Sequence, residues 1–310
     1  MILRMRFSSP AVIWCVIMAV SLSVLNMSCD VTGMMSDEPI SLSYPSNDGI
    51  KPILATTNLS VGERRISFLL TDSTGIVKSE TVTLKVKHIE RSDSFDDIST
   101  ARYYDWPYGR GAYTAMINFD EPGYWQMDIY IDDRNQLIPS RLIEWVDRNA
   151  MIPDVGSIPP KSLSKTFSDS TDIADITTAA NPDTSLYDIT VRKALSNQKP
   201  SVIAFASPAF CTSPTCGPQV EALSQLKNSY DYDLNFIHVE IYDNPQDIQG
   251  NFDVAEVAPA VKEWKLDTLP GWKNESWTFV LDRNGQIRHR FEGFVSSLEL
   301  EHALDSVIVN

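Results

Sequence analysis

The chain has 310 residues, 43% of them hydrophobic, and a formal net charge of −15 at pH 7. Its length and apolar content are enough for about two folded domains. The excess of acidic residues would repel phosphate backbones, which excludes nucleic acid as an expected partner.

Residues 1–28 have the pattern of an export signal. Arg4 and Arg6 give a basic start, and residues 11–25 form an apolar stretch. This stretch is shorter than the ~20 residues of a membrane span, although an uncleaved anchor helix is the alternative. Removal of residues 1–28 would take away two arginines and no acid, leaving a net charge of −17.

Cys29 follows this segment in the stretch LNMSC. The stretch resembles the processing site of bacterial lipoproteins, where a small residue such as Ser28 precedes the cysteine that receives the lipid. The resemblance implies an exported protein held by a lipid anchor at the extracytoplasmic face of a bacterial membrane. Without a lipid, Cys29 would be an odd exposed thiol in an oxidising compartment, which also favours lipidation.

Residues 29–49 are rich in Ser, Asp and Pro and predict a tether, and residues 50–150 predict a domain of short β-strands. Glu121-Pro122-Gly123 predicts the turn of a hairpin, after which apolar residues alternate on one face from Trp125 to Ile131. Strands of this kind, separated by turns, predict a β-sandwich. The region is similar to the immunoglobulin-like domains of exported bacterial redox and metal-handling proteins.

Residues 151–185 are dominated by Pro, Ser, Thr and Asp and predict a mostly irregular linker. From residue 186 onward helical and strand patterns alternate, which predicts an α/β layout. The expected helices are 186–197, 216–230, 257–266 and 296–309, and the expected strands are 200–206, 234–242, 276–282 and 286–294. Asn284-Gly285 predicts a hairpin turn, and Ser296 with Glu299 has the spacing of a capping box.

Cys211 and Cys216 lie between a buried-strand pattern and a helical pattern, in the stretch SPAFCTSPTCGP. This stretch resembles the thioredoxin active site with a lengthened loop, and residues 276–293 resemble the closing hairpin of that family. The resemblance covers roughly residues 152–310 and is closest to exported bacterial thioredoxin-like proteins with a PAFCxxxxCGP centre.

The resemblance implies a thioredoxin-like domain over residues 186–310 with a redox-active Cys211–Cys216 disulfide. The implied function is extracytoplasmic thiol–disulfide exchange with protein thiols or disulfides, without a cofactor or metal. A membrane electron donor or acceptor is the expected second partner. In this family the first cysteine attacks and the second resolves, which assigns these roles to Cys211 and Cys216.

The residues around the pair favour reactive cysteines for physical reasons as well. Pro218 suits the first turn of a helix, where its missing N–H is tolerated, and this places Cys216 at the helix start. The positive end of the helix dipole stabilises a thiolate. Pro214 keeps the intervening residues out of a regular helix, and an accessible disulfide in a loop is easily reduced.

Several other residues stand at characteristic positions of the family pattern. Pro208 and Pro218 flank the cysteines, and Ser276 or Pro270 occupies the place of the family's cis-proline. Ala204 stands where the family buries an acid, so Glu240 or Glu221 is the candidate substitute.

Three other functions are compatible with the same cysteines. A Cu(I) chaperone would need a third ligand, for which His238 and His289 are the candidates. A peroxidase would need a threonine where Pro208 stands, which disfavours that function. A purely structural disulfide in a binding module would close a short loop and contribute only ~2 kcal/mol to stability.

Overall fold

The structure is a computed structural model that describes residues 39–310 except 92–93, 133–136, 171, 231–232 and 309–310. Ile40–Asn310 form one compact unit. The expected export signal and Cys29 lie outside the described residues. Among the residues that are described, no helix has the length and apolar character needed to cross a membrane.

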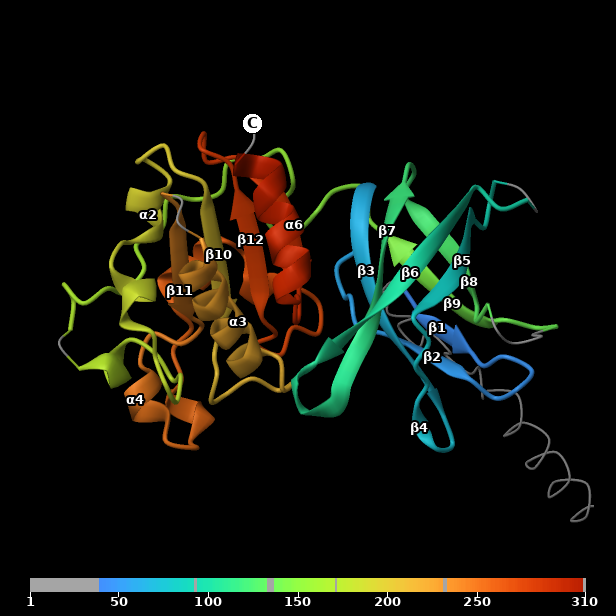
Figure 1. Ribbon diagram of the computed structural model, residues 1–310, viewed down its shortest axis with the longest axis horizontal. Helices are drawn as coiled ribbons and strands as arrows, with labels where there is room; N and C mark the ends of the chain where they lie inside the picture. Colours follow the sequence, from blue (N-terminus) through green and yellow to red (C-terminus); the bar gives the residue numbers. More distant parts are fainter. Residues whose placement is uncertain (1–38, 92–93, 133–136, 171, 231–232, 309–310) are drawn as a thin grey trace, which may run out of the picture. The chain divides into compact units, whose positions relative to one another are not determined.

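The first half of the described chain forms a nine-stranded antiparallel sheet (Figure 1). Its hydrogen-bonded order is β1-β9-β8-β5-β6-β7-β3-β2, with β4 paired to β3. The strands are β1 (Leu42–Tyr44), β2 (Lys51–Leu54), β3 (Gly62–Asp72), β4 (Gly75–Ile76), β5 (Thr81–His88), β6 (Asp97–Trp106), β7 (Arg110–Phe119), β8 (Gly123–Tyr130) and β9 (Ser140–Val146).

The two ends of this sheet approach each other, so that the sheet is nearly closed. The Ser43 hydroxyl on β1 donates to the Pro52 carbonyl on β2 at 2.6 Å. The Ser140 hydroxyl on β9 donates to the Ile50 carbonyl at 2.8 Å. The inward side chains of the alternating strands form a single core that includes Phe68, Tyr113 and Trp125.

The predicted hairpin around Glu121-Pro122-Gly123 is wrong in its pairing. The turn joins β7 to β8, but β8 pairs with β5 and β9, whereas β7 pairs with β6 and β3. As predicted, Trp125, Met127 and Ile129 share one face of β8, and all three belong to the core. The alternation of apolar residues therefore identified the core face without fixing the partner strand.

The second half contains a four-stranded sheet with the order β11-β10-β12-β13. Strands β10 and β11 are parallel, and β12 is antiparallel to both β10 and β13. The elements are α2 (Val191–Ala194), β10 (Ser201–Ala206), α3 (Cys216–Ser229), β11 (Asn235–Glu240), α4 (Pro245–Ile248), α5 (Pro259–Glu263), β12 (Trp277–Leu281), β13 (Ile287–Glu292) and α6 (Ser297–Ile308).

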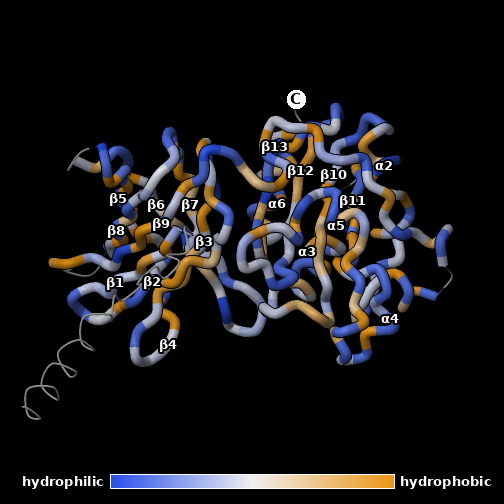
Figure 2. The backbone as a smooth tube through the Cα atoms, turned by 180° about the vertical axis from the view of Figure 1, so that it is seen from behind, coloured by the Kyte–Doolittle hydropathy of each residue, from blue (hydrophilic) through white to orange (hydrophobic). Residues whose placement is uncertain are grey.

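Both faces of this second sheet are covered, and all six residues of β10 are buried. Alternate residues of β10 and β12 pack against α3 and α6 on one face, as Ala204 and Val280 do. On the other face, Phe205 and Phe279 contact Trp264, which follows α5. Figure 2 shows apolar positions recurring along these strands. The loop after β10 therefore leaves a rigid, central strand.

The predicted fold class, an α/β thioredoxin-like domain after an immunoglobulin-like sandwich, is wrong. The described chain is mostly β: a nearly closed antiparallel sheet and a second sheet, with few helices. In the first half, β7 is hydrogen-bonded on both sides, so strands expected in two facing sheets form one. In the second half, the helices predicted over 186–197 and 257–266 shrink to α2 and α5. Among the helices of the described residues, only α3 and α6 are longer than five residues.

Candidate redox site

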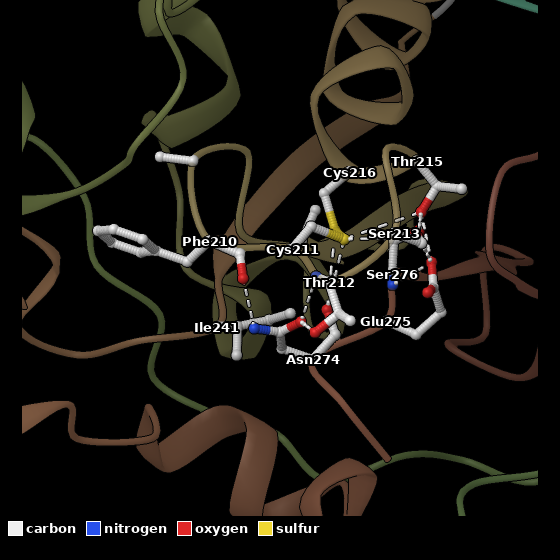
Figure 3. The surroundings of a disulfide bond; sticks show 12 residues. Phe210, Cys211, Thr212, Ser213, Thr215, Cys216, Ile241, Asn274, Glu275 and Ser276 are labelled. Atoms are coloured by element: carbon white, nitrogen blue, oxygen red, sulfur yellow. Dashed lines mark hydrogen bonds between the residues drawn. A yellow bond between two sulfur atoms is a disulfide. The ribbon is translucent and has the colours of Figure 1, made fainter. Parts of the chain in front are cut away.

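Cys211 and Cys216 form a disulfide with their Cα atoms 5.9 Å apart (Figure 3). A turn after β10 brings Cys211 into place, because the Phe210 and Cys211 N–H groups both donate to the Ser207 carbonyl, at 3.0 and 2.9 Å. Pro208 lies within this turn, where its fixed φ is suitable. Cys216 is the first residue of α3, and Pro218 lies in the first turn of that helix.

The two sulfur-bearing residues differ in exposure. Cys216 is fully buried in the core beneath α3, whereas Cys211 is partly exposed and packs against the edge of that core. Only an accessible sulfur can react with a second protein, because thiol–disulfide exchange requires direct attack on the sulfur. Within the pair, access from outside therefore leads to Cys211.

Asn274 holds the loop that carries Cys211. Its Oδ1 accepts hydrogen bonds from Thr212 N and Oγ1 at 2.9 and 3.2 Å. Its Nδ2 donates to Phe210 O at 2.6 Å and to Tyr242 Oη at 2.9 Å. The Asn274 carbonyl oxygen lies 3.6 Å from Cys211 Sγ and 3.7 Å from Cys216 Sγ. Asn274 has a left-handed backbone with φ 53°, which asparagine tolerates better than most residues.

Glu275, the next residue, contacts the two hydroxyl groups beside Cys211. Its Oε1 accepts from Ser213 Oγ at 2.7 Å and from Thr215 Oγ1. Each of these hydroxyl oxygens also lies 3.8 Å from Cys211 Sγ. Figure 3 shows the carboxylate and both hydroxyls on one side of the disulfide. The segment after Asn274 thus places a negative charge one hydroxyl group away from the sulfur.

The remaining predicted positions are spread around this arrangement. Ser276 is fully buried, and its Oγ lies 3.4 Å from Thr215 Oγ1. Pro270 is exposed. It is Asn274 to Ser276, rather than Pro270, that faces the disulfide.

Glu240, but not Glu221, is buried close to the site. Glu221 is exposed on α3, whereas Glu240 ends β11 directly opposite Ala206, the last residue of β10. Burial raises the pKa of Glu240 to about 7. The Glu240 carboxylate accepts from the N–H and hydroxyl of Thr178 at 2.9 and 2.8 Å. Thr178 Oγ1 in turn accepts from Ala209 N at 3.1 Å, so the acid is linked to the turn before Cys211.

The histidines considered as copper ligands have other partners. His238 is buried, its Nε2 donates to Ala206 O at 3.1 Å, and its Nδ1 accepts from Tyr187 Oη at 2.7 Å. This burial lowers the pKa of His238 to about 4. His289 Nε2 contacts Ser306 Oγ at 2.8 Å. Across the described residues, no group of three or more His, Cys, Asp or Glu side chains is arranged to hold a metal ion.

An aromatic cluster adjoins the loop that carries Cys211. Phe210, immediately before Cys211, packs edge-on against Tyr242 and Phe252, with ring centroids 5.9 and 5.5 Å away. Phe252 is 51% exposed. The partly exposed cysteine therefore lies beside an apolar surface.

Sequence analysis missed Asn274 and Glu275, the two residues that contact the cysteine loop most closely. Both lie about 60 positions from the cysteines along the chain, and neither belongs to a recognisable local motif. The only signal was their position just before Ser276, which the family comparison had placed beside the disulfide. That comparison considered Ser276 and Pro270 but not the side chains between them.

The chain matches no protein-family model and shows no significant similarity to a curated protein. Among solved structures, it is similar to a thiol:disulfide interchange protein of the thioredoxin family from Chlorobium tepidum TLS. That match has 12% identity and a TM-score of 0.30, and it covers 37% of this chain and 83% of that one. MtrC from Shewanella baltica OS185 matches at 11% identity and a TM-score of 0.22, covering 59% of this chain and 33% of that one. At such TM-scores we draw nothing about fold or function from either likeness.

Proposed function

We propose that this protein exchanges thiols and disulfides with other proteins through Cys211 and Cys216. The observation that carries the proposal is the asymmetric pair, with a partly exposed Cys211 joined to a fully buried Cys216 at the start of α3. A helix start stabilises a thiolate, and a buried second sulfur is protected from outside attack but remains within reach of the first. The proposal rests on this arrangement and not on the structural likenesses.

The exchange proceeds in two steps. The Cys211 thiolate attacks one sulfur of a partner disulfide, the partner's S–S bond breaks, and its other sulfur leaves as a thiolate that takes up a proton. Cys216 then loses its proton and attacks Cys211 Sγ, which re-forms the internal disulfide and releases the second partner thiol. Two electrons pass from the pair to the partner, and the reverse sequence oxidises a partner dithiol.

Trapping of mixed disulfides tests the proposal. In the full chain, Cys216→Ser should accumulate disulfide-linked adducts with partner proteins, because no thiol remains to resolve them. Cys211→Ser should accumulate none, because the serine hydroxyl at 211 is unreactive and Cys216 is buried. The double variant Cys211→Ser/Cys216→Ser keeps Cys15 and Cys29 and serves as the matched control for adducts formed through those residues.

Three results would contradict the proposal or the roles that it assigns. Adducts in Cys211→Ser but not in Cys216→Ser would reverse the roles of the two cysteines. Adducts in neither variant, together with a disulfide that resists mild dithiol reductants, would make the pair a structural staple. The third result would be tight Cu(I) binding that is lost in His238→Ala or His289→Ala. This result would instead favour the copper function.

We also propose that the protein acts at the extracytoplasmic face of a bacterial membrane, anchored by a lipid on Cys29, with a membrane electron donor or acceptor. The LNMSC stretch and the preceding apolar segment support this location. Cys29→Ala should move the protein from the membrane fraction to the soluble fraction. A mature wild-type chain without an acyl mass, determined by mass spectrometry, would contradict it.

A further inference from the structure

Two hydroxyl groups beside Cys211, those of Ser213 and Thr215, have stronger hydrogen-bond partners than the sulfur. Ser213 Oγ and Thr215 Oγ1 each lie 3.8 Å from Cys211 Sγ, close enough to stabilise a thiolate by donating to it. Both hydroxyls instead donate to Glu275 Oε1, and they lie 2.7 Å from each other. Each hydroxyl has one proton, and an ionised carboxylate can only accept. The contacts with Glu275 and between the two hydroxyls compete for these two protons, and the sulfur at 3.8 Å is the weakest of the competing acceptors.

At Thr215, Glu275 and the backbone N–H groups of the first turn of α3 are alternative partners for the hydroxyl. Thr215 is the N-cap residue of α3, a place where threonine usually accepts a hydrogen bond from a backbone N–H of the first turn. Here the Thr215 side chain forms no such cap and contacts Glu275 instead. Glu275 therefore orients the hydroxyl of the N-cap residue, which lies 3.8 Å from Cys211 Sγ.

We infer that Glu275 makes the pair more strongly reducing, because its carboxylate disfavours the Cys211 thiolate and thereby, at pH values where that thiolate forms, the reduced form of the pair. This inference rests on the proposed function and adds its direction. A thiolate at Cys211 would face hydroxyl lone pairs and a nearby like charge, both of which raise its free energy. Formation of the disulfide removes the thiolate and relieves that repulsion.

A pair with a destabilised reduced form gives up its electrons readily, in contrast to oxidants whose reduced form is stabilised. The preferred reaction is reduction of a partner disulfide: the partner's S–S bond breaks, two electrons pass to its sulfurs, and Cys211 and Cys216 end as a disulfide. A protein dithiol, as the electron donor, must then reduce the pair again. Its two thiols become a disulfide and their two protons pass to Cys211 and Cys216.

The variant Glu275→Gln tests the inference, because glutamine has the same shape and can still contact both hydroxyls but carries no charge. The first measurement is the equilibrium of the pair with glutathione redox buffers. We expect a shift of about tenfold toward the dithiol, equivalent to about 30 mV for this two-electron couple. The second is the alkylation rate of reduced Cys211 at pH 6, which should rise several-fold as more thiolate is present.

Two controls separate this role from a general effect of charge or folding. Glu221→Gln removes one exposed acid from α3, the helix that carries Cys216, and should leave both readouts within twofold of wild type. In a Ser213→Ala/Thr215→Val background, where the hydroxyls are absent, Glu275→Gln should have a smaller effect, because part of the interaction passes through them.

Equal effects of Glu275→Gln and Glu221→Gln, or a shift toward the disulfide, would overturn the inference. Retention of the thermal unfolding midpoint in Glu275→Gln confirms that the readouts concern a folded protein. If Glu275→Gln unfolds, the Ser213→Ala/Thr215→Val protein alone tests the inference. An unchanged equilibrium of its cysteine pair with glutathione would overturn the inference. These equilibria need no partner protein, so their outcome is independent of whether Cys216→Ser traps adducts.

Discussion

Replacement of Asn274 tests how the cysteine loop is held in place. The side chain makes four hydrogen bonds, three with Phe210 and Thr212 and one with Tyr242. Alanine removes all four, and a typical bond of this kind contributes about 1 kcal/mol net. Asn274 is buried, but its partners Phe210, Thr212 and Tyr242 are at least partly exposed, so water can satisfy part of what they lose, which reduces the expected cost to about 2–3 kcal/mol.

The backbone conformation of Asn274 adds a second contribution to the free energy of unfolding, and this contribution differs between Asn274→Ala and Asn274→Gly. At φ 53° an alanine is strained by about 1–2 kcal/mol, whereas glycine is not. Glycine also gains freedom in the unfolded chain, which offsets about 0.4–1 kcal/mol of this difference. Asn274→Ala should therefore lower the free energy of unfolding by about 3–5 kcal/mol, and Asn274→Gly by somewhat less.

Urea denaturation of the oxidised protein measures these free energies, and the rate of disulfide reduction by dithiothreitol measures how firmly the loop is held. Both Asn274 variants should be reduced several-fold faster than wild type. Asn251→Ala is the matched control, because that exposed side chain forms one local hydrogen bond, to Asp253 N at 3.2 Å. A loss below about 0.5 kcal/mol in Asn274→Ala, or a glycine variant less stable than the alanine variant, would refute the reasoning.

Three further changes test other parts of the structure. Burial raises the pKa of Glu240 to about 7 from 4.5, so its stabilising contribution is complete below pH 4.5 and is lost as the pH rises through 7. Relative to Glu240→Gln, wild type should lose up to about 3 kcal/mol between pH 5 and 8 in urea titrations, and parallel curves would contradict this. Trp264→Ala should cost about 3–5 kcal/mol, because the buried ring packs 4.9 Å from Phe205 and 4.8 Å from Phe279; a loss under about 1 kcal/mol would mean that the core repacks. Ser296→Ala should cost about 1 kcal/mol, since Ser296 Oγ accepts from Glu299 N at 3.3 Å, and an unchanged thermal midpoint would count against the capping box.

The elements that the sequence predicted well are those with strong local signals. The hairpin at Asn284-Gly285 forms between β12 and β13, with Gly285 at φ 77°. The capping box of Ser296 and Glu299 starts α6 with reciprocal hydrogen bonds. The helix beginning at Cys216 is also present as predicted. In each case, residues a few positions apart determine the conformation by themselves.

The features that the sequence did not predict depend on contacts between distant segments. The alternation of buried residues is the same in a two-sheet sandwich and in one nearly closed sheet, so it could not reveal that β7 pairs with β3. Similarly, the position of Asn274 and Glu275 beside Cys211 follows from the pairing of β10 with β12. Helix α5 is also shorter than predicted. Apolar residues of the predicted segment, such as Trp264, are buried without being part of a regular helix.

The near closure of the first sheet has a consequence for how the chain folds during synthesis. Consecutive strands such as β6 and β7 pair locally and can form early, whereas the pairing of β1 with β9 joins Leu42 to Ile143. Such distant pairings close long loops and form slowly. Until residue Val146 has been made, β8 lacks its β9 neighbour and β1 has no partner strand, so unpaired N–H and C=O groups remain at open edges. A nascent chain that stalls before this point would therefore expose strand edges that can pair with other chains. Addition of β9, the last strand of the sheet, protects the chain against association with its own copies.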